Sequence, residues 1–498
     1  MAYDEVISES SMTPRCLRPA LLAAALLPGL VGHAQETDVS ERLFRSGEKA
    51  YAMNTPAEAL ETWDLLIKQD PRSPFAAQAL LRIARHHAES KTPLAAMPFL
   101  ERLKVEHPRS PWAAEAMLLR GILLAQAAKR PQDLREAMAE FNRLLDSFPN
   151  HPATAAANYQ LGLAWRDQGQ PGRALLNFLE AARLDPRSDT AQAATLQAAE
   201  ALDASGDLQG CLRMLQRIRN LAPKSPEAQE AAWRIAVRVK QRLVKAPLRS
   251  TGPWPAGKVK WLKTPTLLAT GPGGELFIFQ DDLDRAFELR NNELVAVGPM
   301  AKNAKAMTIG PNGGPWLVPA KAPVQRDEGS LGLAGPAAPG GAFLDRWGTL
   351  WMSDAKNPAL MLLAPDGNSR SLPSPTAVAL APLPGGGAVL ASDSNRSLHI
   401  LNSQGVPQLT VPYGKDLPGG VAFRYVLAMA SDPLGHVAAI VDGGDFEGEV
   451  LWGPDGLVLR SATFKALGIS GKFRAIALDR QGGIILADRS NDLLIRLE

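Results

Sequence analysis

The side chains with the clearest potential for chemistry are four cations on one predicted helical face. Arg234, Arg238, Arg242 and Lys245 follow one another at i, i+4, i+8 and i+11, which places them on one stripe of a helix. Residues 231–249 contain no Asp or Glu. The stripe is either a solvated face that benefits from a helix C-terminus, or a docking surface for an acidic protein or anionic polymer. We take these four residues as candidate partner-binding residues. If carboxylates of the second half of the chain neutralise them, the stripe instead joins the two halves.

Three aspartates could contribute to a divalent-cation site. Asp354, Asp393 and Asp488 occupy similar places in repeated segments, and a metal centre needs several oxygen or histidine ligands that converge. Asp at such places also hydrogen-bonds the backbone of tight turns, and we favour that interpretation. The acidic segment 442–448 lacks EF-hand spacing and is expected to be a solvated loop. His399 alternates with apolar neighbours and is expected to face outward. No catalytic residue, metal ligand or cofactor is therefore expected.

Other signatures of catalysis or ligand binding are weak. Seven histidines and two cysteines leave little material for a metal centre or a disulfide framework. With 54 Lys and Arg against 51 Asp and Glu, the charge balance gives no support to bulk polyanion binding. The chain has no basic and aromatic stripe that would favour nucleic acid. The glycine-rich segment 271–274 lacks the Lys-Ser/Thr pair of a phosphate loop and is expected to be a turn.

Residues 1–34 have the layout of an export leader. Arg15 and Arg18 precede an apolar run over 20–31, which is too short to span a bilayer comfortably. Small residues at 32 and 34 then suit a signal-peptide cleavage after Ala34, with an N-terminal membrane anchor as the alternative. The true start could be Met12. The mature chain is expected to be periplasmic or secreted, without a transmembrane span.

The cysteines agree with this interpretation of the leader. Cys16 lies before the apolar run, so a lipoprotein anchor is not expected. After cleavage only Cys211 remains, so no internal disulfide can form.

The first half of the chain repeats a helix-stopping phrase. Proline ends a helix and restricts the residue before it, and the first prolines of the phrases are 37, 41, 37 and 37 residues apart. The phrases occupy residues 70–74, 107–111, 148–152, 185–189 and 222–226. Each interval holds two amphipathic helices, about 153–168 and 171–184 in the fourth unit. A closing helix is expected over 227–244.

The fourth unit carries a family resemblance. Small and large residues alternate on its helices, as close helix packing requires, and the pattern resembles the tetratricopeptide repeat (TPR). The matching residues are Tyr159, Leu161, Gly162, Ala164, Trp165, Gly169, Ala174, Phe178, Ala181, Asp185 and Pro186. The 37-residue period resembles repeats of bacterial envelope proteins, such as outer-membrane assembly and Tol-Pal-associated factors. The resemblance implies a superhelix of five repeats with a protein-binding groove.

The second half repeats a strand unit with glycine turns. Gly274, Gly314, Gly348, Gly386, Gly435 and Gly483 are spaced by 40, 34, 38, 49 and 48 residues. Units of this length with several short strands predict propeller blades, and six units account for the segment. The fourth strand of the last blade is expected from 258–262, which would pair with the strand near 493–497 and remove an open edge.

The strand units resemble NHL repeats, which build six-bladed propellers. The segment 477–491 carries the resemblance best, followed by 389–395 and 348–354. The resemblance implies an all-β, six-bladed ring.

The sequence thus predicts a multidomain α + β protein. A TPR superhelix over 35–245 is followed by a Pro/Gly linker at 246–257 and a propeller over 258–498. We expect an exported, non-enzymatic protein–protein interaction scaffold of the bacterial cell envelope, with protein partners. The alternative is an exported, metal-dependent hydrolase or lyase of the lactonase type with a TPR targeting arm. Fold alone cannot distinguish the two functions.

Overall fold

The computed structural model describes residues 39–90, 92–244, 248–255, 259–326, 329–414, 417 and 421–498. The predicted leader and Lys245 lie outside these residues. None of the described helices is long and apolar enough to cross a membrane. The chain forms two compact units, Met1–Ala128 with Asp133–Gln160 and Lys129–Gln132 with Leu161–Glu498.

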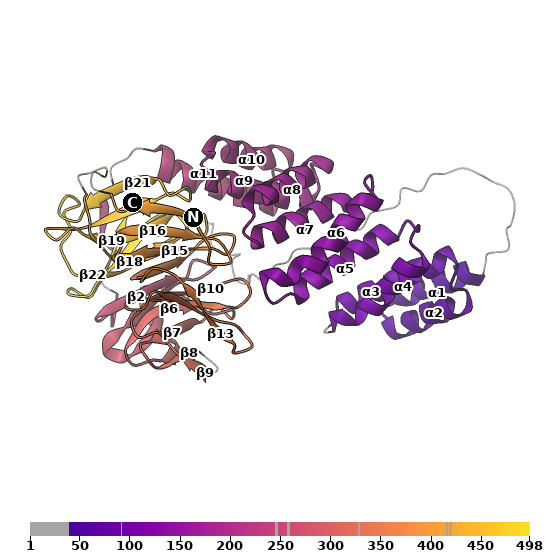
Figure 1. Ribbon diagram of the computed structural model, residues 1–498, viewed down its shortest axis with the longest axis horizontal. Coiled ribbons are helices and arrows are strands. Elements are labelled where there is room, and N and C mark those ends of the chain that lie inside the picture. The colour runs from indigo at the N-terminus through magenta and orange to yellow at the C-terminus, as the bar shows by residue number, and fades with distance from the viewer. Residues whose placement is uncertain are drawn as a thin grey trace. The chain divides into compact units, whose positions relative to one another are not determined.

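Within the described residues, five helix pairs precede a closing helix (Figure 1). The pairs are α1 (Val39–Ala52) with α2 (Pro56–Gln69), α3 (Pro74–Ala88) with α4 (Met97–Glu106), α5 (Ala113–Ala127) with α6 (Arg135–Ser147), α7 (Ala153–Asp167) with α8 (Pro171–Leu184), and α9 (Asp189–Ala204) with α10 (Leu208–Leu221). Short 3₁₀ turns, η1 (Pro93–Ala96) and η2 (Pro131–Leu134), precede α4 and α6. The closing helix α11 (Pro226–Arg238) continues into a π-helical turn, η3 (Val239–Leu243). The prediction of five repeats and a closing helix is confirmed.

The repeated proline phrase both ends one helix and caps the next. Ser73, Ser188 and Ser225 accept hydrogen bonds from backbone N–H groups at the start of α3, α9 and α11. A serine at this position satisfies a donor that the helix itself leaves free. Proline at the first helical position of α3 and α11 costs no hydrogen bond. Gly169 ends α7 with a φ of +70°, a conformation that glycine adopts without strain.

Small residues on the first helix of a repeat receive an aromatic ring from the second. A Cβ on Gly121 would lie 2.4 Å from the Phe141 ring, and one on Gly162 would lie 2.5 Å from the Phe178 ring. Both distances are far below van der Waals contact, so only glycine allows the two helices to approach this closely.

Polar contacts join consecutive repeats. Arg82 on α3 pairs with Glu48 on α1 at 2.7 Å, and Arg85 pairs with Glu115 on α5. In the second unit, Arg166 on α7 donates to the side chain of Gln197 on α9 at 2.8 Å. The first helices are therefore linked from α1 to α5 in the first unit and from α7 to α9 in the second.

The second half forms six four-stranded antiparallel sheets within the described residues. Blades 1 to 3 are β2 (Pro265–Thr270), β3 (Leu276–Gln280), β4 (Arg285–Arg290) and β5 (Glu293–Met300); β6 (Ala304–Ile309), β7 (Pro315–Pro319), β8 (Pro323–Arg326) and β9 (Gly329–Ala334); and β10 (Pro339–Leu344), β11 (Leu350–Asp354), β12 (Ala359–Leu363) and β13 (Ser369–Pro373). A 3₁₀ turn, η4 (Asp281–Leu283), joins β3 to β4.

Blades 4 and 5 are β14 (Ala379–Pro382), β15 (Ala388–Ser392), β16 (Ser397–Leu401) and β17 (Pro407–Pro412); and β18 (Tyr425–Ser431), β19 (Val437–Asp442), β20 (Glu447–Trp452) and β21 (Val458–Thr463). Blade 6 combines β22 (Phe473–Leu478), β23 (Ile484–Asp488) and β24 (Leu493–Leu497) with β1 (Ser250–Pro253). The first strands of neighbouring blades pack against one another, and contact between β2 and β22 closes the ring. The six-bladed propeller is confirmed.

Each predicted glycine turn joins the first and second strands of its blade. Gly274, Gly348 and Gly435 adopt φ values of +96°, +74° and +86°, which side chains with a Cβ rarely reach. Apolar residues of adjacent blades then pack between the sheets. For example, Ile440 and Leu451 of blade 5 share a core with Ile476 of blade 6.

The strand that closes the last blade is not the predicted one. β1, inside the predicted linker, pairs with β24, with Ser250 opposite Leu497. The predicted segment contributes Val259 and Leu262 to an apolar core instead, and Lys260 makes an isolated parallel bridge to Glu293. The prediction of closure by an N-terminal strand was right in kind and wrong in its residues, because β1 pairs through its backbone and has no apolar signature.

Candidate functional site

The predicted cationic stripe lies in a cluster of ion pairs. Arg234 pairs with Glu200 at 2.5 Å and with Glu230 at 2.7 Å. Arg238 pairs with Asp203 at 2.7 Å and with Glu200 at 2.9 Å. The Arg238 side chain is completely buried. Glu200 and Asp203 both lie on α9, so the closing helix is joined to the preceding repeat.

Arg242 extends this cluster to the propeller. Its guanidinium pairs with Asp203 and with Asp455, each at 2.5 Å. Asp455 lies in the turn between β20 and β21 of blade 5. The side chains of Arg242 and Asp455 are each only 7 % exposed. Three guanidinium groups thus face four carboxylates, and one of these carboxylates belongs to the propeller.

A second contact joins α7 to blades 3 and 4 within the same compact unit. Asp167, the last residue of α7, pairs with Arg346 of the β10–β11 turn at 2.6 Å. The Ser403 hydroxyl of the β16–β17 turn donates to the Asp167 backbone carbonyl at 2.5 Å. Burial raises the pKa of Asp167, while Arg166 and Arg346 act in the opposite direction.

A third contact joins α11 and η3 to blade 6. The Trp233 indole donates to the Arg480 carbonyl at 2.6 Å, and the Arg480 guanidinium lies over the same ring, 5.4 Å from its centroid. The Gln241 amide donates to the Gly482 carbonyl. We call the three contacts together the helix–propeller seam.

The turns in the seam all lie at one end of the blades. They join either the first strand to the second, as at Arg346 and Arg480, or the third to the fourth, as at Ser403 and Asp455. In an antiparallel four-stranded blade these two kinds of turn lie at the same end of the strands. The seam therefore occupies one face of the propeller and leaves the second-to-third-strand turns on the other.

The seam holds its charges in a buried environment. Burial disfavours the charge of Arg238, but Glu200 and Asp203 outweigh it and raise the pKa of the guanidinium. The pKa of Arg234 is raised in the same way, against burial, by Glu200 and Glu230. Both arginines are thus fixed as cations, and removing a partner would leave an uncompensated buried charge.

The structure thus places three of the four candidate binding residues, and it brings Arg234, Arg238 and Arg242 together. Their carboxylate partners lie on α9 and on blade 5, outside the acid-free window around α11. The repeat period is the signal that could have found the α9 partners, because Asp203 and Arg238 are 35 residues apart. Lys245 lies outside the described residues. Binding of an acidic partner by the stripe stays a prediction.

Two of the three repeated aspartates bind their own turns, and the third bonds to more distant strands. Asp354 accepts from the Lys356 backbone N–H at 2.8 Å and the Asn357 amide at 2.6 Å. Asp488 accepts from the Asn491 amide at 2.6 Å and from nearby backbone N–H groups. Asp393 accepts from the Tyr413 hydroxyl at 3.0 Å and the Val426 N–H at 3.1 Å. The interpretation as turn aspartates is confirmed for Asp354 and Asp488, whereas Asp393 instead joins blade 4 to Val426 of blade 5.

The other singled-out polar residues also have local structural partners. Asp442 and Glu447 face each other at the ends of β19 and β20, so the acidic segment is a tight hairpin turn. His399 is only 8 % exposed, and the expectation that it faces outward is wrong. Its ring nitrogens contact Ser397 at 2.9 Å and Thr410 at 3.2 Å. Within the described residues, no cluster of His, Cys, Asp and Glu has the arrangement of a metal site.

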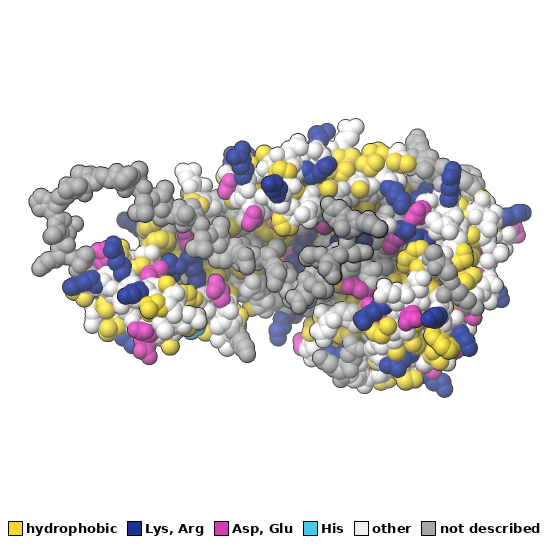
Figure 2. Space-filling model, turned by 180° about the vertical axis from the view of Figure 1, so that it is seen from behind, with side chains coloured by type: hydrophobic (Ala, Val, Ile, Leu, Met, Phe, Trp, Pro, Cys, Tyr) yellow, Lys and Arg dark blue, Asp and Glu magenta, His cyan; other side chains and the backbone are white. Residues whose placement is uncertain are grey.

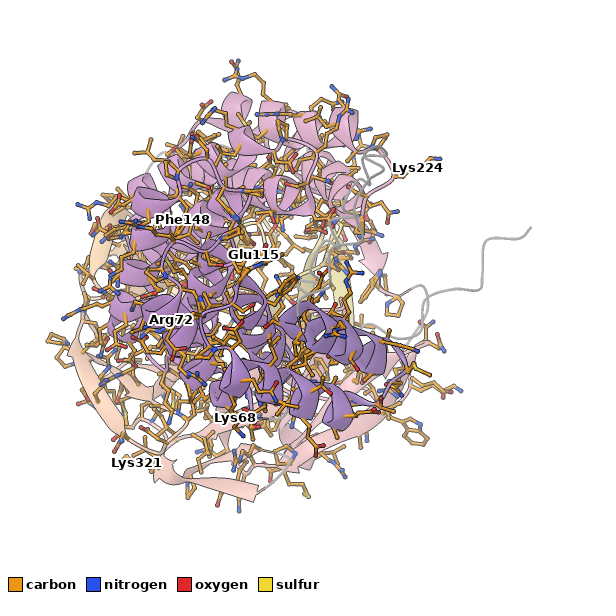
Figure 3. All side chains as sticks on the ribbon, turned by 90° about the vertical axis from the view of Figure 1, so that its right-hand side faces the viewer. Lys68, Arg72, Glu115, Phe148, Lys224 and Lys321 are labelled. Carbon is orange, nitrogen blue, oxygen red and sulfur yellow. The ribbon has the colours of Figure 1, made fainter. Side chains whose placement is uncertain are left out.

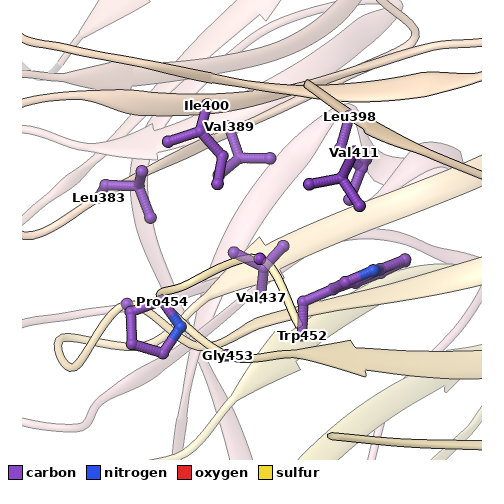
Figure 4. Close-up of a pocket in the computed structure, with 11 residues that line it drawn as sticks. Leu383, Val389, Leu398, Ile400, Val411, Val437, Trp452, Gly453 and Pro454 are labelled. Atoms are coloured by element: carbon purple, nitrogen blue, oxygen red, sulfur yellow. The ribbon is translucent and has the colours of Figure 1, made fainter. Parts of the chain in front are cut away.

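One enclosed pocket lies between blades 4 and 5 (Figure 4). Aliphatic side chains such as Val389 and Val437 line it together with Trp452. Its interior volume is about 10 Å³, close to the smallest space that holds one water molecule. This pocket is a packing gap and has no polar group for chemistry.

Two buried groups outside the seam have altered acidities. Burial raises the pKa of Glu449 on β20 to about 7, with Arg460 acting in the opposite direction. Within the described residues, neither carboxylate oxygen of Glu449 has a hydrogen-bond partner. Burial also raises the pKa of the Cys211 thiol to about 12, which keeps it protonated and unreactive.

Comparison with protein families gives one match. A family model described as "YfiO: Outer membrane lipoprotein" matches residues 76–174, which span α3 to the start of α8. No curated protein is similar enough in sequence to be matched.

Solved structures resemble the two halves separately and distantly. A virginiamycin B lyase from Staphylococcus aureus is 15 % identical, covers 47 % of this chain and 80 % of its own, and has a TM-score of 0.35. PilW, described as a type IV pilus biogenesis factor, is 19 % identical over 42 % of this chain and 96 % of its own, with a TM-score of 0.32. The MamA protein is 17 % identical over 37 % of this chain and 92 % of its own, with a TM-score of 0.30.

Proposed function

We propose that this protein is a non-enzymatic protein–protein interaction scaffold of the bacterial cell envelope. The observation that carries the proposal is the helix–propeller seam. Helical repeats and propellers are both architectures that present binding surfaces. A joint made of buried ion pairs holds the last repeats against one propeller face, so two surfaces of different kinds belong to one unit.

The envelope location rests on two lines of support. Residues 76–174 match a family of outer-membrane lipoproteins, and the predicted leader over 1–34 would export the chain. We infer that the mature protein acts in the periplasm or outside the cell.

The polar groups of the propeller favour binding over catalysis. Asp354, Asp393 and Asp488, the residues best placed by sequence for a metal site, already accept hydrogen bonds from backbone N–H groups, in their own turns for Asp354 and Asp488 and on the next blade for Asp393. A carboxylate that is satisfied in this way is poorly available as a ligand or general base. No observation specifically favours the alternative hydrolase or lyase function.

We infer that the propeller binds its partner through the face opposite the seam. Blade 4 illustrates the two faces. Arg396 is exposed in the turn before β16, on the open face, whereas Gln404 follows β16 in the turn that contacts Asp167. The open face consists of the second-to-third-strand turns and the connections between blades.

The proposed function is tested with the full mature chain. The tagged protein is immobilised, an envelope extract is passed over it in buffer with and without EDTA, and retained proteins are identified by mass spectrometry. We expect a specific envelope protein to be retained in both buffers, at a level well above an unrelated propeller control. Failure to retain any protein above the control, together with a lyase or hydrolase activity that EDTA removes, would overturn the proposal.

A further inference from the structure

The outward face of α10 has unpaired cations, in contrast to α11. Arg213, Gln216, Arg217, Asn220 and Leu221 follow the spacing of one helical face, and with Pro186 they line an open hollow of about 580 Å³. The hollow is shallow and open to solvent, which suits a chain that lies along the surface. We call the lining the α10 groove.

The charged side chains of α10 and its flanking residues are all positive. Residues 208–226 contain four cations and no Asp or Glu. Among the described residues, neither Arg213 nor Arg217 has an ion pair, and Asp185, next to Pro186, pairs with neither of them. On the neighbouring α8, by contrast, Arg183 is neutralised by Glu180 at 2.7 Å. Unpaired arginines beside apolar surface suit recognition of carboxylates.

The groove is partly ordered before any partner binds. Arg217 donates to the Ala182 carbonyl of α8 at 3.4 Å, which restrains its guanidinium and leaves other N–H groups free. Gln216 donates to the Asn220 side chain at 2.9 Å. Leu221 is 38 % exposed and supplies an apolar end beside Pro186. Restrained side chains lose less entropy on binding.

We propose that the α10 groove binds an extended acidic peptide segment of a protein partner, through the pattern Glu-x-Glu-x-Leu or its reverse. Arg213, Arg217 and Leu221 are separated by four residues each, about 6 Å along a helix. Alternate residues of an extended peptide are separated by about 6.6 Å. Two carboxylates therefore face the two arginines while the leucine packs on Leu221 and Pro186. The inference rests on the proposed scaffold function and identifies one of its surfaces.

The apolar end distinguishes a peptide from other anions. An anionic polysaccharide or a lipid headgroup supplies charge but no aliphatic side chain at this spacing. Lys224 projects outward from the helices in Figure 3 and lies outside the groove lining, which makes it suitable for a control.

The test uses the full chain and synthetic peptides. Binding of fluorescein-labelled Glu-Ser-Glu-Ser-Leu, of its reverse, and of a matched Gln-Ser-Gln-Ser-Leu peptide is measured by anisotropy. The variant R213E/R217E is compared with the control K224E/K465E, which has the same charge change at two lysines outside the groove lining. Circular dichroism and thermal melting verify that both variants are folded.

We expect one acidic peptide to bind saturably, about tenfold more weakly to R213E/R217E, and within about twofold of wild type to K224E/K465E. Binding should weaken with added salt. Equal losses in both variants, equal binding of the Gln peptide, or no saturable binding would overturn the proposal. So would binding to phosphatidylglycerol vesicles that an excess of the acidic peptide does not displace. If neither acidic peptide binds saturably while the full chain still captures an envelope protein, the α10 groove is wrong while the scaffold function stands.

Discussion

Arg238 is the residue on which the joint between the last repeat and the closing helix depends most. Its side chain is completely buried and contacts Asp203 and Glu200. Buried ion pairs contribute little relative to an apolar core, but loss of one partner leaves the other charge buried and unpaired. Arg183 has a similar pairing with Glu180, but its side chain is 68 % exposed, so water can replace the lost partner.

Arg238→Met should therefore destabilise the protein far more than Arg183→Met. We expect a loss of about 3 to 5 kcal/mol for the first variant and little change for the second, because exposed ion pairs contribute little to stability, with both measured by urea unfolding. Similar losses for the two variants would contradict the structure of this cluster.

Glu449 predicts a pH dependence of stability. Burial raises the pKa of its carboxyl group to about 7, whereas an unfolded glutamate titrates near 4.3. Between these values the folded state binds the additional proton, so the free energy of unfolding falls as pH rises and levels off above pH 7. Between pH 5 and pH 8 the loss should be about 2 to 3 kcal/mol, and Glu449→Gln should remove it.

Urea unfolding at pH 5 and pH 8 measures this effect. Glu447→Gln is the control, because Glu447 lies on the same strand and is paired with Arg474 near the surface. An unchanged pH dependence in Glu449→Gln would disprove the assignment.

The sequence predicts that the seam arginines share one helical face, but it does not reveal which carboxylates they pair with. The shared face follows from their spacing of four residues within a single helix, and this spacing is visible in the sequence. Their partners come from α9 and blade 5, and such contacts depend on how repeats stack. The α10 arginines are equally visible in sequence, but only the structure distinguishes a groove with free cations from a stripe whose cations are paired.

Among the elements, β1 decides whether the propeller ring is complete. Two of its flanking amides donate to β24, Arg249 to the Glu498 carbonyl at 3.0 Å and Trp254 to the Leu494 carbonyl at 2.8 Å. Without β1, the backbone of β24 would be an exposed edge.

The variant Arg249→Pro/Trp254→Pro removes both amide donors. At about 1 kcal/mol per hydrogen bond, it should cost about 2 kcal/mol and increase hydrogen exchange in β24. Lys260→Ala, which removes the exposed ion pair with Glu293, should cost less than about 1 kcal/mol. If Lys260→Ala exposes β24 and the double proline variant does not, closure by β1 is wrong.

The blades were predictable because glycine turns recur with nearly regular spacing. Each turn needs a residue with a positive φ, which favours glycine, and the recurring glycines are visible in the sequence. The closing strand has the sequence Ser-Thr-Gly-Pro, which is typical of a linker. Its pairing depends on the backbone alone, and hydrophobic periodicity does not reveal it.

At the scale of the whole molecule, the seam joins the last repeats to the propeller within one compact unit. One compact unit comprises Lys129–Gln132 and Leu161–Glu498, so it holds the helices after α7 together with the propeller. The last repeats belong to the propeller's unit because ion pairs and hydrogen bonds join them. Separate folding of two halves around the predicted linker stays a prediction.

Figure 2 shows both signs of charge interspersed on the surface seen from behind, which agrees with the small net charge.

Reversing one seam charge should loosen the closing helix from the propeller. Asp455→Arg places a cation against Arg242, and we expect limited proteolysis over 244–249 to become at least about threefold faster, since a buried attraction becomes a repulsion. Asp366→Arg is the control, because Asp366 occupies the equivalent turn of blade 3, where its side chain is exposed and bonds to Asn368 of the same turn. Equal proteolysis of both variants would argue against the seam.

Site-specific photo-cross-linking in the cell envelope tests the scaffold function most directly. A photoreactive residue replaces either Arg396, on the open propeller face, or Gln404, at the opposite end of β16 beside the seam. The full chain is irradiated, and cross-linked products are identified by mass spectrometry. We predict a discrete adduct with another envelope protein from position 396 and none from position 404. Adducts from position 404 alone, or no protein adduct from either position, would contradict binding through the open face.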